Sequence, residues 1–111
     1  MINWQKVVLD QNDKIQSAVE VLNNEALRIV MIVDESKQLV GTVTDGDIRR
    51  GLIKHISIDA KISEIMFKKP TVVLEGTNQE SIINKMKELD LLQIPIIDSN
   101  KQVVGMETLH H

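Results

Sequence analysis

Residues 38–47 of this chain read QLVGTVTDGD, and residues 102–111 read QVVGMETLHH. An offset of 64 residues brings the two segments together, and it also aligns residues 8–47 with residues 72–111 without a gap. Ten of the forty aligned pairs are identical, whereas average residue usage would give roughly two or three. The identical pairs are Val8/Val72, Ser17/Ser81, Leu27/Leu91, Ile32/Ile96, Asp34/Asp98, Lys37/Lys101, Gln38/Gln102, Val40/Val104, Gly41/Gly105 and Thr44/Thr108. The chain therefore contains one structural unit twice.

The first part of each copy predicts a strand followed by a helix. Short β-rich runs at 7–9 and 71–73 precede polar residues that can cap a helix N-terminus. The expected caps are Asn12 and Asp13 in the first copy and Thr77 and Asn78 in the second. Apolar residues then recur at helical spacing. They are Ile15, Ala18, Val19 and Leu22 in the first copy and Ile82, Ile83, Met86 and Leu89 in the second.

The second part of each copy predicts a β-hairpin, because β-branched runs flank an Asp-containing turn. The expected strands are 29–33 and 38–43 in the first copy and 94–97 and 102–106 in the second. In the first copy Thr44 can then cap a helix that continues through Leu52. The second copy reaches His111 where the corresponding helix would begin. We expect the chain to be a piece of a longer protein.

The repeat divides the chain into three parts. We assign residues 1–53 to the first repeat, 54–70 to a linker and 71–111 to a second repeat without its last helix. Within the linker, residues 61–66 are expected to form a short helix before Pro70.

The composition is that of an ordinary globular domain. The chain has 111 residues, of which 42% are apolar and 26% charged, and its net charge is −3, so nothing directs it toward nucleic acid or an anionic membrane. It contains no Cys, which excludes disulfides, a thiolate nucleophile and Cys-ligated metals. The longest apolar run, 29–33, is far shorter than the roughly 20 residues that span a bilayer. We expect a cytoplasmic location.

A βαββα unit that occurs twice, with a Gly-x-x-Thr-x-x-Asp segment leading into a helix, resembles the cystathionine-beta-synthase (CBS) domain in a tandem pair. The resemblance extends from about residue 6 to residue 111 and rests on IVMIVD (29–34), LVGTVTDGD (39–47), ISEIM (62–66) and PTVV (70–73). It implies an α/β (α+β) fold in which two βαββα repeats are related by pseudo-two-fold symmetry, with small mixed sheets flanked by helices. More narrowly, VTDGDIRRGL (43–52) and the linker after it resemble the CBS pairs N-terminal to bacterial sugar-phosphate nucleotidyltransferases.

The resemblance also implies a ligand, because CBS pairs bind adenosine nucleotides, and sometimes S-adenosylmethionine, in clefts between their repeats. Thr44 would offer its hydroxyl and the helix N-terminus to a phosphate. Asp47 would accept hydrogen bonds from both ribose hydroxyls. The other implied ligand residues are Thr42 on the ribose or adenine side, Arg28 toward the phosphates, Leu91 and Leu92 around adenine, and Ser63 from the linker.

The second copy departs from this pattern at two positions. His111 stands at the position of Asp47, and Leu92 at that of Arg28. An imidazole cannot offer two carboxylate oxygens to a diol, so we expect one competent nucleotide site per pair. A His111 that came from an expression tag would remove this argument.

Plainer explanations exist for the same residues. Thr44 can be an ordinary helix cap, and Asp47 can simply complement the helix dipole. Asp45 and Asp47 would need more oxygen ligands to hold magnesium, and Arg49 and Arg50 point about 100° apart on a helix, which favours a solvated surface over a phosphate clamp. We expect no metal site.

No nucleophile paired with a base occurs in a pattern that suggests catalysis. The chain is therefore interpreted as a non-enzymatic regulatory module that requires no cofactor. Its expected ligands are AMP, ADP or ATP, with S-adenosylmethionine behind them, and its expected effect is on a covalently attached nucleotidyltransferase domain outside these residues. The alternative is a ligand-free structural dimerisation module. We expect a homodimer through the CBS helices.

Overall fold

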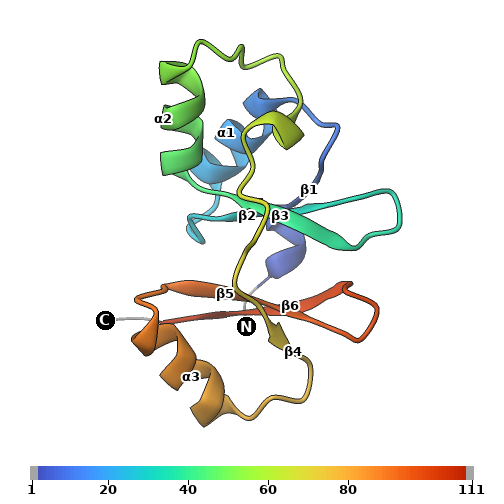
Figure 1. The fold of residues 1–111 in the computed structure, drawn as a ribbon, viewed down its shortest axis with the longest axis vertical. Helices are drawn as coiled ribbons and strands as arrows, with labels where there is room; N and C mark the ends of the chain where they lie inside the picture. The colour runs from blue at the N-terminus through green and yellow to red at the C-terminus, as the bar shows by residue number, and fades with distance from the viewer. Residues whose placement is uncertain (1–2, 110–111) are drawn as a thin grey trace.

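The structure of the chain, a computed structural model, describes residues 3–109, and each repeat forms its own three-stranded sheet (Figure 1). The first repeat consists of η1 (Trp4–Val7), β1 (Val8–Asp10), α1 (Ile15–Asn24), β2 (Val30–Val33), β3 (Leu39–Val43) and α2 (Asp45–Ile53). The linker holds η2 (Ile62–Glu64), and the second repeat consists of β4 (Val73–Leu74), α3 (Gln79–Glu88), β5 (Gln93–Ile97) and β6 (Val103–Thr108). Within residues 3–109 the second repeat has no counterpart of α2.

Both sheets have the same topology. The strand orders are β1-β2-β3 and β4-β5-β6, with a parallel first pair and an antiparallel hairpin in each. A parallel pair needs a long crossover connection, and α1 and α3 supply it. The register shifts at Ile32/Val33 in one hairpin and at Ile96/Ile97, the positions 64 residues later, in the other. The two mixed sheets that the resemblance implied are confirmed.

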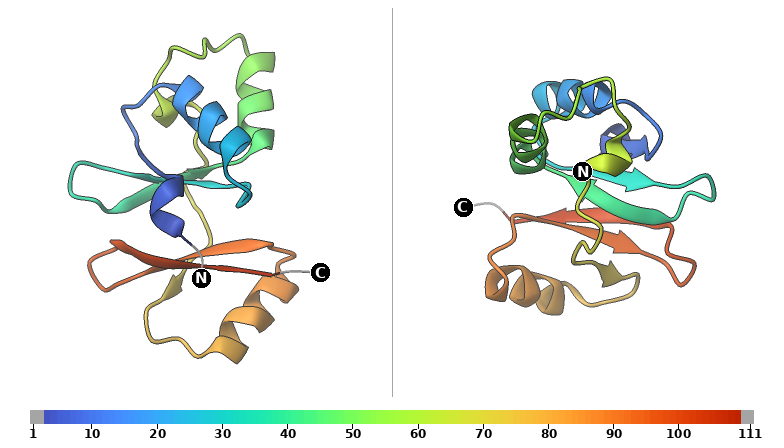
Figure 2. Two further views of the ribbon diagram at one scale, coloured as in Figure 1. Left: turned by 180° about the vertical axis from the view of Figure 1, so that it is seen from behind. Right: turned by 45° about the horizontal axis from the view of Figure 1, so that its top comes forward.

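The two sheets lie face to face, with the helices on the outer sides of both (Figures 1 and 2). Their hairpin turns exchange hydrogen bonds across the repeats: Gln38 Nε2 donates to the Asn100 carbonyl at 2.9 Å, and Gln102 Nε2 donates to the Ser36 carbonyl at 2.9 Å. Donors and acceptors are both 64 residues apart in sequence. The pseudo-two-fold axis therefore passes between the two turns.

Apolar residues form three clusters, because each strand sends alternate side chains to opposite faces of its sheet. One cluster lies between the first sheet and its helices, one between the two sheets, and one between the second sheet and α3. Their buried members are Ala18, Val30, Ile32, Val43 and Ile62 in the first, Val7, Ile29, Met31 and Met106 in the second, and Val73, Ile82, Met86 and Ile94 in the third. All four residues of β2 are buried, as expected for a strand covered on both faces.

The predicted cap of the first helix is wrong. α1 follows Lys14 and has no side-chain cap. The Asp13 carboxylate instead accepts a hydrogen bond from the Asp10 N–H at 3.0 Å, and the Asp10 carboxylate accepts one from the Asn12 N–H at 2.8 Å. These short polar side chains close a turn before the helix, an alternative that Asn and Asp always offer.

In the second repeat the predicted cap is confirmed at Asn78, whose side chain accepts from the Ser81 N–H at 2.8 Å. Thr77 instead donates its hydroxyl to the Leu74 carbonyl. The predicted apolar stripes are confirmed only in part, because Val19 and Leu89 are exposed. The linker helix is a single 3₁₀ turn, η2, which is shorter than the predicted segment.

Candidate functional site

A cavity of about 340 Å³ lies between the repeats. It is bounded by the end of β3, the linker after η2, and the turn between α3 and β5. Its lining residues are Ile29, Thr42, Thr44, Phe67, Pro70, Thr71, Asp90, Leu91, Leu92, Gln93 and Pro95. We call it the inter-repeat cavity.

The structure brings four of the seven predicted ligand residues to this cavity. They are Thr42, Thr44, Leu91 and Leu92. Thr42 and Thr44 come from the first repeat and the two leucines from the second, so residues about 50 positions apart in sequence face one space. Thr42 is only 6% exposed, whereas Leu92 is 43% exposed at the rim.

The other three predicted residues lie outside the cavity lining. Arg28 lines two neighbouring hollows, one shared with Asp45 and the other with Leu92. Asp47 lines a separate hollow on the far side of α2. Ser63 lies in η2, where its N–H donates to the Gln11 carbonyl at 3.1 Å.

At the start of α2, Asp47 is committed to its own helix. One carboxylate oxygen accepts from the Thr44 N–H at 2.9 Å and from the Thr44 hydroxyl at 3.2 Å. The other oxygen accepts from Arg50 Nη2 at 2.7 Å. The Asp47 side chain is 10% exposed, against 63% for Arg50. In this arrangement Asp47 is a helix-capping residue, and a phosphate at Thr44 would require the hydroxyl to rotate away from the carboxylate.

The linker is fixed against β3, and this contact forms one wall of the cavity. Thr42 and Phe67 exchange two backbone hydrogen bonds, at 3.0 and 2.8 Å. The approach is so close that a methyl group added at Gly41 would lie 2.8 Å from the Phe67 carbonyl oxygen. Gly41 therefore allows the linker to cross the strand.

Sequence reasoning missed several lining residues, above all Phe67 and Asp90. Phe67 is the sole Phe of the chain and remains 53% exposed, which is a weak signal of a ligand contact. Asp90 looked like an ordinary polar residue between a helix and a strand.

The lining suits binding and offers little for catalysis. Six of the lining residues are apolar, three are threonines, one is Gln93, and Asp90 alone carries an ionisable side chain. Apolar walls with a few polar groups are typical of small-molecule sites. Within residues 3–109 no group of three or more His, Cys, Asp or Glu side chains could hold a metal ion.

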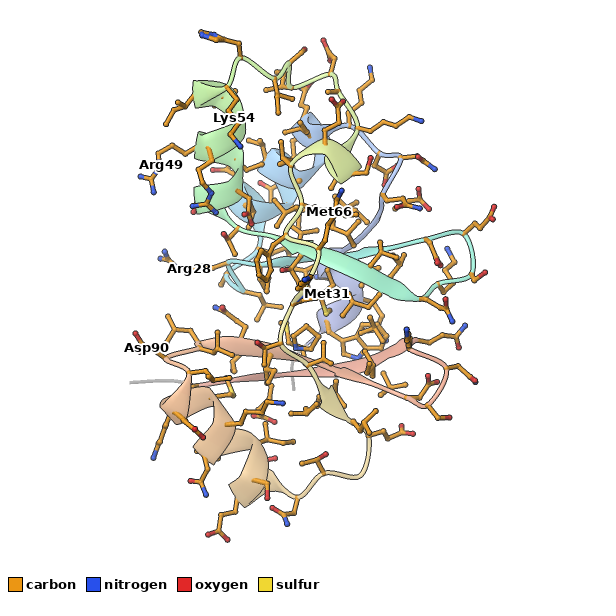
Figure 3. All side chains as sticks on the ribbon, in the orientation of Figure 1. Arg28, Met31, Arg49, Lys54, Met66 and Asp90 are labelled. Atoms are coloured by element: carbon orange, nitrogen blue, oxygen red, sulfur yellow. The ribbon has the colours of Figure 1, made fainter. Side chains whose placement is uncertain are left out.

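The pseudo-symmetric counterpart of this cavity is filled by the protein itself. An offset of 64 takes Thr42, Thr71, Gln93 and Pro95 to Met106, Val7, Ile29 and Met31. These four counterparts are the buried cluster between the sheets, and Trp4 of η1 packs against them. In Figure 2, η1 lies between the sheets, and Met31 is labelled in the same space in Figure 3. A hollow of about 200 Å³ remains, lined by residues that include Arg28 and Thr108.

The prediction of one competent site thus has a physical basis that the sequence argument did not use. That argument depended on His111, which, like His110, lies outside the described residues.

In the part of the chain that the structure describes, every helix is too short or too polar to cross a bilayer.

Comparison with known proteins supports the fold. The family model for the CBS domain matches residues 2–54 and 62–106. A homoserine O-acetyltransferase of Methanosphaera stadtmanae is 35% identical over 106 residues, which cover 95% of this chain and 21% of that protein. The chain spans about a fifth to a third of the length of the curated relatives it matches.

Two solved structures resemble the whole chain. The CBS domain pair of protein MJ0100, in complex with 5′-methylthioadenosine and S-adenosylmethionine, has a TM-score of 0.77 and 27% identity and covers 92% of this chain and 80% of that chain. Protein PAE2072 from Pyrobaculum aerophilum, complexed with AMP, has a TM-score of 0.77 and 17% identity and covers 97% of this chain and 87% of that chain.

Proposed function

The chain belongs to the CBS domain family, and from that premise we propose that it is a regulatory module that binds an adenine nucleotide in the inter-repeat cavity. The observation that carries the proposal is the asymmetry between the two clefts. One is open and lined by threonines and apolar side chains, and its counterpart is filled by Met31, Met106 and their neighbours. We therefore propose one nucleotide per chain.

The proposed ligands are AMP, ADP or ATP, with S-adenosylmethionine behind them. Similar CBS proteins were solved with AMP and with S-adenosylmethionine, which supports this class of ligand. The adenine ring would lie against Leu91, Leu92 and Phe67, and a phosphate would lie at Thr44, where the α2 N-terminus favours an anion. In this proposal Asp47 keeps its sequence-based role at the ribose and uses its remaining lone pairs, since a carboxylate accepts about four hydrogen bonds.

Such a ligand can regulate because it contacts both repeats. Thr44 belongs to the first repeat and Leu91 to the second, so binding favours one relative arrangement of the two sheets. A ligand shifts an equilibrium only through a difference in affinity between its states, and a site made of two bodies provides that difference.

The attached activity is a further proposal. We propose that the module, which itself has no catalytic role, biases a covalently linked sugar-phosphate nucleotidyltransferase in the cytoplasm, on the resemblance carried by residues 43–52. The relatives named above have other activities, so they do not support this choice of partner domain.

Calorimetric titration of the chain with AMP, ADP, ATP, S-adenosylmethionine and GTP tests the proposal. We expect micromolar binding of an adenine ligand at one per chain. Leu92→Ala should weaken it at least tenfold, because truncation removes apolar contact worth about 1.5–3 kcal/mol. Leu89→Ala is the matched control, since Leu89 is similarly exposed at 49% and lies outside the cavity lining.

A folded chain that releases no heat with any of these ligands would instead favour the second candidate, a ligand-free structural dimerisation module. The exposed Leu52 and Ile53 of α2 support that candidate. A specific homodimer should bury at least about 1,200 Å² in total, and sedimentation of Ile53→Glu beside the wild type would detect its loss.

A further inference from the structure

Asp90 is the one residue of the inter-repeat cavity lining with an ionisable side chain. It follows the C-cap of α3, Leu89, with φ at 57°, a left-handed conformation that glycine adopts at least cost and that Asp tolerates. Its carboxylate has no hydrogen-bond or ion-pair partner among residues 3–109. The position therefore carries an acid that the local backbone does not require.

The cavity has opposite electrostatic character at its two ends. Thr44 marks the N-terminus of α2, where the helix dipole is positive, and Asp90 marks the C-terminus of α3, where the dipole is negative and the carboxylate adds to it. Figure 3 places Asp90 at the end of α3, beside the space between the repeats. A phosphate is favoured at Thr44 and repelled at Asp90.

A nucleotide in this field has its base toward Asp90. Leu91 and Leu92 follow directly in the chain and line the same cavity, so the carboxylate adjoins the apolar wall that would hold a purine. A carboxylate only accepts hydrogen bonds. Adenine presents an N–H donor at position 6, whereas guanine and hypoxanthine present a carbonyl oxygen there.

We propose that Asp90 determines the base specificity of this site, by accepting a hydrogen bond from the 6-amino group of adenine and repelling the 6-oxo group of other purines. The proposal rests on the proposed function and adds the selection of the base. It also explains why a left-handed position that suits glycine holds an acid.

Calorimetric titration with AMP and IMP tests this role, because the two nucleotides differ only at position 6 of the purine. The wild type should bind AMP about tenfold more tightly than IMP. In Asp90→Asn, whose amide can also donate to a carbonyl oxygen, the ratio should fall to about two or less. Glu88→Gln is the matched control: it removes an exposed acid near the same helix end but outside the cavity lining, and it should leave the ratio unchanged.

The outcomes separate the two proposals. Absence of AMP binding to the wild type overturns both. AMP binding with the same AMP-to-IMP ratio in Asp90→Asn, or an equal change in Glu88→Gln, overturns only the role of Asp90. A loss in Asp90→Asn that occurs with AMP but not with 2′-deoxy-AMP would assign Asp90 to the ribose and would also overturn it.

Discussion

Gly41 and Gly105 occupy equivalent positions in the two repeats, yet substitution by alanine should have opposite effects. A methyl group at Gly41 would lie 2.8 Å from the Phe67 carbonyl oxygen and 2.9 Å from Met66 Sδ. At Gly105 the nearest atom would be Cδ1 of Ile96 at 3.5 Å, an ordinary contact. Neither glycine has a positive φ, so alanine is conformationally acceptable at both.

The magnitude follows from two opposing effects. Replacing Gly by Ala where the backbone permits it stabilises a protein by about 0.4–1 kcal/mol, because the unfolded chain loses entropy. Overpacking against a fixed group costs about 1–3 kcal/mol, and at Gly41 that group is backbone, held by the two hydrogen bonds between Thr42 and Phe67. Gly105→Ala should therefore be neutral or slightly stabilising, and Gly41→Ala should be destabilising by about 1–2 kcal/mol.

Urea unfolding of the wild type and both variants measures the difference, which should be about 2 kcal/mol, with equal m values for all three proteins. Midpoints of thermal unfolding should separate by several degrees in the same direction. Equal stability of the two variants, to within about 0.5 kcal/mol, would refute the argument that Gly41 exists to let the linker cross β3.

Two other predictions concern the start of α2 and the filled cleft. Asp47→Ala should lower the free energy of unfolding by about 1 kcal/mol, because the Thr44 N–H loses its acceptor, whereas Arg50→Ala should cost less, since that side chain is 63% exposed; equal losses in thermal unfolding would contradict this. Met31→Ala should destabilise the chain by about 2–4 kcal/mol, because Met31 is fully buried between the sheets, and a folded Met31→Ala that unfolds like the wild type would show that this cleft is loosely packed.

Much of the fold could be predicted because its signals are local. The β-branched runs, the helical spacing and the offset of 64 residues identified two strand-helix-hairpin units. The prediction that Thr44 begins a helix is confirmed, with Asp47 reaching back to its N–H. The cap at Asp13 failed because an Asp side chain can close a turn as readily as it caps a helix.

The sequence by itself determined that the chain is a pair of similar units and where each element begins, within a few residues. Only the tertiary structure decided which of the two equivalent clefts is open. In the sequence Val7, Ile29, Met31 and Met106 are ordinary apolar residues, and nothing local distinguishes them from any other core residue. They fill one cleft because the two sheets pack face to face and bring them together, whereas their counterparts, which include Thr42 and Thr71, meet Phe67 and Asp90 around a cavity. Such contacts depend on how distant segments pack, and the local pattern of residues does not encode that.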